Sequence, residues 1–235
     1  MRPEPYAWSL HPEATLGIVA LGLAYLLVFR KHELPRWRVA CWAAGFGLLL
    51  ATAVTPIDPL SYHLLTIHLL QNVVLAEWAP ALLVLGLPPA LARALPVHPV
   101  AGLGVWLAIY GLWHVPFVYD AALRSPPLLH LEHVSYLAAG IAFWLPLLHR
   151  PFSDAAKALY LFAAFVLASP IGLLLALLPG PVYGYYEEGR GLWGLSPLED
   201  QQLAGLTMAG EQSVVFFAAF LVFFLRFLRA EELTS

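Results

Sequence analysis

Cysteine and charged residues are scarce in this sequence of 235 residues. The one cysteine, Cys41, excludes an internal disulfide and any paired-cysteine metal or redox motif. Charged residues make up 11% of the chain, whereas soluble proteins carry about 25%. With 60% hydrophobic residues, the chain has more apolar surface than a water-soluble fold can bury, so we predict that its solvent is lipid. The net charge of −3 is small, and we predict no nucleic-acid partner.

Long apolar runs are abundant. We predict an all-α membrane protein, in which residues 1–235 form one domain, a bundle of seven transmembrane helices. Each apolar segment, as a helix, is long enough to cross about 30 Å of hydrocarbon. The predicted spans are 13–30, 37–55, 61–86, 99–119, 127–148, 155–178 and 197–228. The first twelve residues contain no apolar run, so we expect no cleavable signal peptide.

Lysine and arginine fall mostly on one side of the predicted bundle. Because cytoplasmic loops carry an excess of these residues, we predict that the N-terminus lies outside and the C-terminus in the cytoplasm. The predicted cytoplasmic set is Arg30, Lys31, Arg36, Arg38, Arg93, Arg150, Lys157, Arg226 and Arg229. The predicted outer set is Arg2, Arg124 and Arg190.

Histidines are concentrated near the predicted outer face. At 1.5 Å of helix rise per residue, His68, His114 and His133 lie roughly 10 Å deep on three different helices. Met208 lies somewhat deeper on the last helix. Ionisable side chains inside a membrane are costly and usually mark a site or a pathway. We predict a shared polar site, and the alternative that each ring only hydrogen-bonds a neighbouring helix stays open.

Imidazoles with a thioether and nearby carboxylates suit a soft or borderline metal ion. Cu(I) accepts His and Met, whereas zinc accepts His with a carboxylate, and the pattern does not choose between them. The candidate metal ligands are His68, His114, His133, His130 and Met208. The candidates for supporting roles are His63, Asn72, Glu132, Asp200 and Gln201. Of these, Glu132 and Asp200 are expected to orient imidazole N–H groups.

Three short motifs occur in a characteristic order. They are Trp113-His114-Val115-Pro116, His130-Leu131-Glu132-His133, and Asp200-Gln201-Gln202-Leu203-Ala204-Gly205 followed by Met208. Together with the segment from Pro59 to Gly86, they resemble the CtaG family of assembly factors for cytochrome c oxidases, haem-copper enzymes of the caa type. The resemblance covers roughly residues 55–210.

The resemblance implies a role and a set of partners. It implies a seven-helix protein of the bacterial inner membrane that is an assembly factor rather than an enzyme. Such a protein binds copper, as Cu(I), near the outer face and delivers it to the buried copper centre of the oxidase catalytic subunit. The implied partners are that subunit, a periplasmic copper donor and the membrane lipid.

One position departs from the family pattern. Where the family's third-helix motif resembles His-Met-x-Gln-His, this chain reads His68-Leu69-Leu70-Gln71-Asn72. An amide is a much poorer copper ligand than an imidazole. The substitution predicts weaker metal binding here, or the use of His63 instead.

Other readings of the same residues stay open. An intramembrane zinc hydrolase also uses three histidines with a carboxylate, and a metal-free scaffold for oxidase assembly needs no ligands. The outer loop 179–196 is rich in Tyr, Trp and Gly, which favours interfacial anchoring over a docking lid. Glu77 and Glu211 lie at similar depth in the inner half of the bundle, and their role is open.

Overall fold

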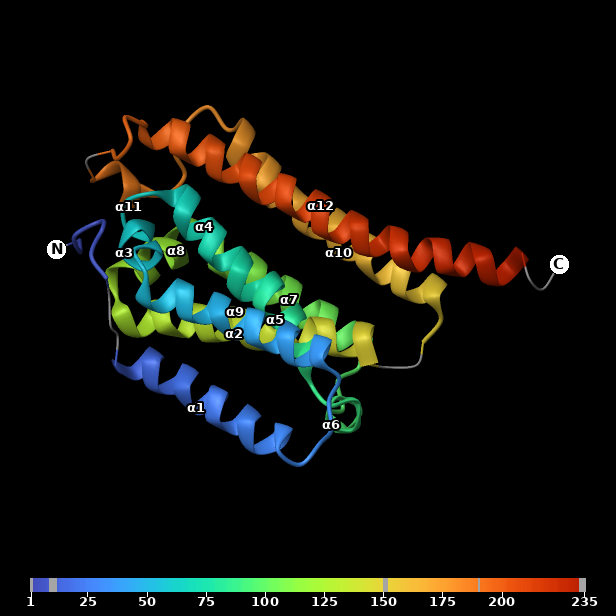
Figure 1. Ribbon diagram of the computed structural model, residues 1–235. Coiled ribbons are helices and arrows are strands. Elements are labelled where there is room, and N and C mark those ends of the chain that lie inside the picture. The colour runs from blue at the N-terminus through green and yellow to red at the C-terminus, as the bar shows by residue number, and fades with distance from the viewer. Residues whose placement is uncertain (1, 9–11, 150–151, 190, 233–235) are drawn as a thin grey trace.

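The computed structural model describes residues 2–8, 12–149, 152–189 and 191–232, and within these ranges its regular structure is helical (Figure 1). Arg150 and Arg190, which entered the orientation prediction, lie outside the described residues. The helices are α1 (Pro12–Phe29), α2 (Arg36–Val54), α3 (Ile57–Ser61), α4 (Leu65–Val73), the π-helix η1 (Val74–Trp78), α5 (Ala79–Gly86), α6 (Pro89–Ala94), α7 (Pro99–Trp113), α8 (Pro116–Arg124), α9 (Pro126–His149), α10 (Asp154–Leu177), α11 (Gly184–Glu187) and α12 (Pro197–Glu232).

Within the part of the chain that the structure describes, five helical stretches are long and apolar enough to cross a membrane. They are α2, the continuous stretch Leu65–Gly86, α9, α10 and α12. The bent pair α7 and α8 makes a sixth if it counts as one span, and Thr15–Leu27 within α1 is a shorter apolar helix. The predicted all-helical, multi-pass membrane fold is confirmed, whereas the count of seven and the orientation of the termini stay predictions.

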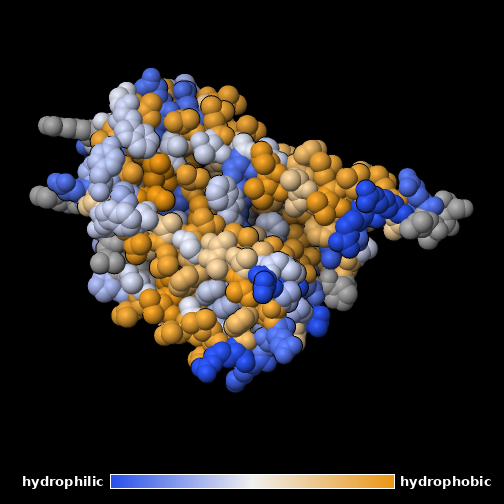
Figure 2. Space-filling model, in the orientation of Figure 1, coloured by the Kyte–Doolittle hydropathy of each residue, from blue (hydrophilic) through white to orange (hydrophobic). Residues whose placement is uncertain are grey.

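The stretch Leu65–Gly86 lies at the centre of the bundle. In this stretch 72% of the most apolar window is buried, against 6% for the window of α12. The helices α10 and α12 run side by side along one flank, and α12 continues past the rest of the bundle (Figure 1). Hydrophobic side chains cover much of the surface, as expected of a lipid-facing protein (Figure 2).

Two predicted spans differ from the helices in the structure. The span predicted at 61–86 starts as a helix only at Leu65, because Leu64 is extended and α3 forms a separate short helix before it. The span predicted at 99–119 breaks after Trp113, and α8 turns away from α7 by 75°. The cause of this second break is Pro116, which disfavours helical geometry at the residue before it. Val115 is accordingly extended, with φ −67° and ψ 123°.

A close approach between η1 and α9 fixes the centre of the bundle. A Cβ atom added to Gly140 would lie 2.3 Å from the carbonyl oxygen of Ala76, so only glycine fits at this contact. Ala76 belongs to the π-helical turn, a rare feature that is frequent at functional sites. This contact accompanies the approach of the N-terminal half of α9 to α4, where Glu132 lies within hydrogen-bond distance of His68 and Asn72.

Candidate functional site

His114 is positioned by the corner between α7 and α8. It caps the end of α7, where its ring Nδ1 lies 2.8 Å from the carbonyl oxygen of Tyr110. A carbonyl oxygen only accepts, so Nδ1 carries the proton and Nε2 holds a lone pair. His114 Nε2 is buried and has no hydrogen-bond partner among the described residues. Metal-binding histidines are commonly oriented in this way, with one ring nitrogen donating to a carbonyl.

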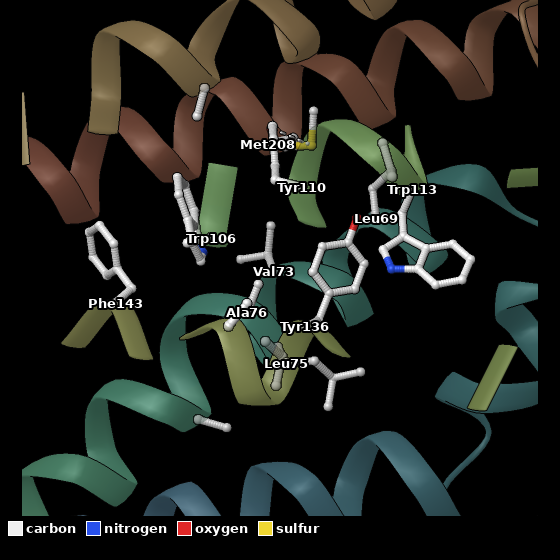
Figure 3. Close-up of a cluster of buried hydrophobic side chains, with 14 of the residues drawn as sticks. Leu69, Val73, Leu75, Ala76, Trp106, Tyr110, Trp113, Tyr136, Phe143 and Met208 are labelled. Atoms are coloured by element: carbon white, nitrogen blue, oxygen red, sulfur yellow. Dashed lines mark hydrogen bonds between the residues drawn. The ribbon is translucent and has the colours of Figure 1, made fainter. Parts of the chain in front are cut away.

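A small cavity adjoins His114. Its volume is about 10 Å³, close to what a single water molecule requires. Met208, Asn72, Tyr110 and Tyr136 line it together with His114. The tyrosine hydroxyl of Tyr110 lies 3.3 Å from the sulfur of Met208 and donates to it (Figure 3). This cavity therefore brings together a free imidazole nitrogen, a thioether and the position at which the family pattern has a histidine.

His68 belongs to a neighbouring hydrogen-bonded group. Its Nε2 lies 3.3 Å from Glu132 Oε1, and Asn72 Nδ2 donates to the same oxygen at 2.8 Å. His68 Nδ1 lies 3.3 Å from the hydroxyl of Tyr186, which itself donates to the carbonyl oxygen of Ser61. Both ring nitrogens of His68 are thus engaged in this conformation. The expectation that Glu132 orients an imidazole agrees with this geometry.

His130 and His133 lie apart from the small cavity. Both line a larger pocket on another side of α9. The ring centroid of His133 is 6.3 Å from that of His68, and His133 Nε2 has no hydrogen-bond partner within the described ranges. Three imidazoles therefore do not converge on one point. Among the described residues, no group of three or more His, Cys, Asp or Glu side chains is arranged to hold a metal ion.

Asp200, Gln201 and His63 have other contacts in the structure. The carboxylate of Asp200 accepts from the backbone nitrogens of Leu65 and Thr66, at 2.6 and 3.1 Å, and so caps the start of α4. Gln201 bonds backbone groups of the segment that leads from α10 into the outer loop. His63 Nε2 lies 2.7 Å from the carbonyl oxygen of Pro3 at the surface.

A family model describes most of this chain. The model of the cytochrome c oxidase caa3 assembly factor family, Caa3_CtaG, matches residues 22–230. The chain belongs to this family. The resemblance stated from the motifs is thereby confirmed, and the matched region contains every candidate residue named above. No curated protein and no solved structure matches the chain.

Tyrosines of this caa3 assembly factor cover the site in a way that the motifs did not reveal. Tyr183 donates to the carbonyl oxygen of His114 at 3.3 Å and stacks on Tyr119, with the ring centroids 4.1 Å apart. Tyr186 contacts His68, as described above. Both tyrosines come from the aromatic outer loop, beside or within α11, so part of the loop reaches inward and does not serve only as an interfacial anchor. In the sequence, the high tyrosine content of this loop was the feature that could have indicated these contacts.

An exposed ion pair fastens this tyrosine-bearing segment to α8. The guanidinium of Arg124 donates two hydrogen bonds to the carboxylate of Glu188, at 2.9 and 2.8 Å. These bonds lower the pKa of Glu188 below its usual value. The ion pair links the end of α8 to the end of α11. It thereby helps to keep Tyr183 and Tyr186 in contact with His114 and His68.

Buried acids in the assembly factor connect to Met208 through a hydrogen-bonded chain. Gln212 Nε2 donates to Glu77 Oε1 at 3.3 Å and to the hydroxyl of Tyr110 at 3.1 Å. That hydroxyl in turn donates to Met208. The second acid, Glu211, accepts a hydrogen bond from the indole of Trp78. The orientation of the Tyr110 hydroxyl beside Met208 is thus fixed by Gln212, which Glu77 holds in turn.

Proposed function

We propose that this assembly factor binds Cu(I) as its cargo between His114 and Met208 and delivers it to the buried copper centre of the oxidase catalytic subunit. An imidazole nitrogen and a thioether are donors that Cu(I) accepts. The observation that carries the proposal is the unpartnered Nε2 of His114, a residue that lines the same small cavity as Met208. Copper is the cargo, so no resident metal is needed for the fold.

The chemistry of the ligand set suits transfer. A thiolate would bind Cu(I) tightly, and the one cysteine, Cys41, is on α2, outside the lining of the small cavity. Neutral imidazole and thioether ligands give a weaker bond that a stronger acceptor site can outcompete. Asn72 in place of a histidine lowers the affinity further.

His68, His133 and His130 enter the proposal as further ligands along the route of the ion. His68 becomes available when its Nε2 leaves Glu132, and the carboxylate then remains beside the cation as a counter-charge. His133 Nε2 is unpartnered on the same outer part of α9. The ring centroids of His68 and His133 are 6.3 Å apart, a short distance for an ion that passes from one ligand to the next.

We further propose a topology for this delivery. The chain crosses the bacterial inner membrane seven times, with its N-terminus outside and its C-terminus in the cytoplasm. The site then lies near the outer face, where a periplasmic donor can load it. The loaded protein passes the ion sideways to the oxidase subunit within the membrane.

A competition titration tests the copper site. Cu(I) held by a chromogenic chelator is titrated with the detergent-solubilised full chain, in the wild type and in His114→Ala and Met208→Leu. His63→Ala is the matched control, since that histidine lies at the surface outside the small cavity. We expect binding of one ion that is lost in both site variants and kept in the control.

Two other results would contradict the proposal. Absence of Cu(I) binding in the wild type would favour a metal-free scaffold for oxidase assembly. Tight zinc binding that excludes Cu(I) would favour the zinc hydrolase, although a catalytic zinc usually takes three protein ligands and the described residues contain no such group of His, Cys, Asp or Glu.

A further inference from the structure

A pocket lies between α1 on one side and α2 and α9 on the other. Its volume is about 370 Å³, within the usual range of about 300–1,000 Å³ for ligand pockets. In Figure 1, α1 runs beside the bundle, on the side of α2 and α9. Val134 lines the pocket and is 64% exposed, so the pocket is open to the lipid-facing surface.

The wall formed by α1 leaves room for a ligand. Gly17 lines the pocket, and a Cβ atom added there would meet no atom within 4 Å. Ile18 and Leu21 continue the α1 wall, and Leu137 lies on the opposite wall in α9. A long apolar chain fits this part of the pocket, because the side chains on both walls are apolar.

Polar residues gather at one end of the pocket. They are Thr52, Asp58, His130 and His133, which come from the end of α2, from α3 and from the first two turns of α9. The described lining contains no Lys or Arg. A phosphate would therefore meet a carboxylate without a cation, which disfavours a phospholipid headgroup. His133 also lies roughly 10 Å along α9, below the level at which phosphates stay.

We propose that this pocket binds a membrane-soluble isoprenoid quinone. Such a molecule combines an uncharged ring that carries oxygen atoms with a long apolar tail. The ring oxygens of the quinone would accept hydrogen bonds from imidazole N–H groups, the hydroxyls of the reduced quinol would donate to the Asp58 carboxylate, and the tail would lie along α1. The two-histidine motif of α9 would then hold the quinone whenever no ion is bound to it, and the cavity of His114 and Met208 is separate from this pocket. Quinone binding therefore does not require copper binding between His114 and Met208.

A binding measurement with a blocked pocket tests this. A decyl-tailed benzoquinone is equilibrated with the solubilised full chain, and bound quinone is extracted and measured by absorbance. In Gly17→Phe the added ring fills the pocket from α1. In the control, Gly47→Phe, the ring is added to an exposed glycine of α2 that also has no atom within 4 Å and does not line the pocket.

We expect about one quinone per chain in the wild type and in Gly47→Phe, and at least about tenfold weaker binding in Gly17→Phe. Decylbenzene, which has the same tail and no oxygen atoms, should fail to displace the quinone at equal concentration. Equal binding in all three proteins would overturn the proposal. Displacement by decylbenzene or by dioleoyl phosphatidylglycerol as effective as by unlabelled quinone would also overturn it, since the pocket would then recognise any lipid tail.

Discussion

The small cavity at His114 and the pocket beside α1 share a wall and differ in almost every other property. The small cavity at His114 has a volume of about 10 Å³ and lies among buried donor groups. The pocket beside α1 has a volume of about 370 Å³ and opens to the surface. The wall between them consists of η1 and α9, where Leu75 and Leu137 face the pocket and Ala76 and Tyr136 face the small cavity. Neighbouring residues of one helix thus line two cavities that differ in volume and in the side chains around them.

The largest expected effect comes from damage to this shared wall. Gly140→Val places a side chain against the carbonyl oxygen of Ala76, where a Cβ atom would lie 2.3 Å away. Overpacking of this kind costs about 1–3 kcal/mol and sometimes more. Thermal unfolding in detergent should show a clearly lower Tm, and both ligands should bind less well. Gly111→Val, at a helical glycine with no atom within 4 Å, is the control; an equal Tm in the two variants would contradict the wall contact.

A change confined to the small cavity should have an intermediate effect. Asn72→His adds an imidazole beside Met208 and His114, so we expect Cu(I) affinity to rise about tenfold, or ~1.4 kcal/mol. The competing-chelator titration measures it. Asn72→Gln is the control, because it keeps an amide and adds only one methylene. A similar affinity in the two variants would mean that this face of α4 does not reach the metal.

A smaller effect is expected at the ion pair that joins α8 to α11. The lowered pKa of Glu188 means that its ion pair with Arg124 stabilises the fold at neutral pH. This contribution is present above the unfolded-state pKa and is lost as the pH falls through the folded-state pKa. Glu188→Gln should therefore lower Tm slightly at pH 7 and not at pH 2, below the folded-state pKa. A difference in Tm that is the same at both pH values would contradict the ion pair as its cause.

The smallest effect tests whether the two sites are separate. Gly17→Phe fills the pocket beside α1, and its Cu(I) affinity should stay within about twofold of the wild type, because α1 does not line the small cavity. The same chelator titration measures this. A large loss of copper binding in Gly17→Phe would join the two cavities into one functional unit.

Helix positions and caps were predictable from local chemistry. The apolar runs located every long helix, and the residues Ser196-Pro197-Leu198-Glu199 form a capping box at the start of α12, in which Ser196 N donates to Glu199 Oε2 at 2.8 Å. The span predicted at 99–119 was wrong at Pro116, where the chain does not continue as one helix and α8 turns from α7 by 75°. Sequence spacing does not show whether neighbouring helices will satisfy the backbone groups that a proline leaves without hydrogen bonds, and so whether the helix continues.

The partners of the candidate residues were predictable only in part. The depth of His68, His114 and His133 could be counted along each helix, but the rotation of one helix against another depends on contacts such as Gly140 with Ala76. That rotation decides that Asn72 and Met208 accompany His114 while His133 faces the pocket. Asp200 shows the same limit, because its carboxylate caps a helix that is remote in sequence.

The hydrogen bond between His114 and Tyr110 joins residues four apart at the end of a single helix. The imidazole and the carbonyl that orients it therefore move together with α7, so a shift of a neighbouring helix does not break this hydrogen bond. Met208 is carried by a different helix, α12. A cargo ion held between them is chelated only while α7 and α12 stay in register. A slide of one helix along the other would open that chelate without unfolding either helix, and would leave a ready-made half-site for the next ion.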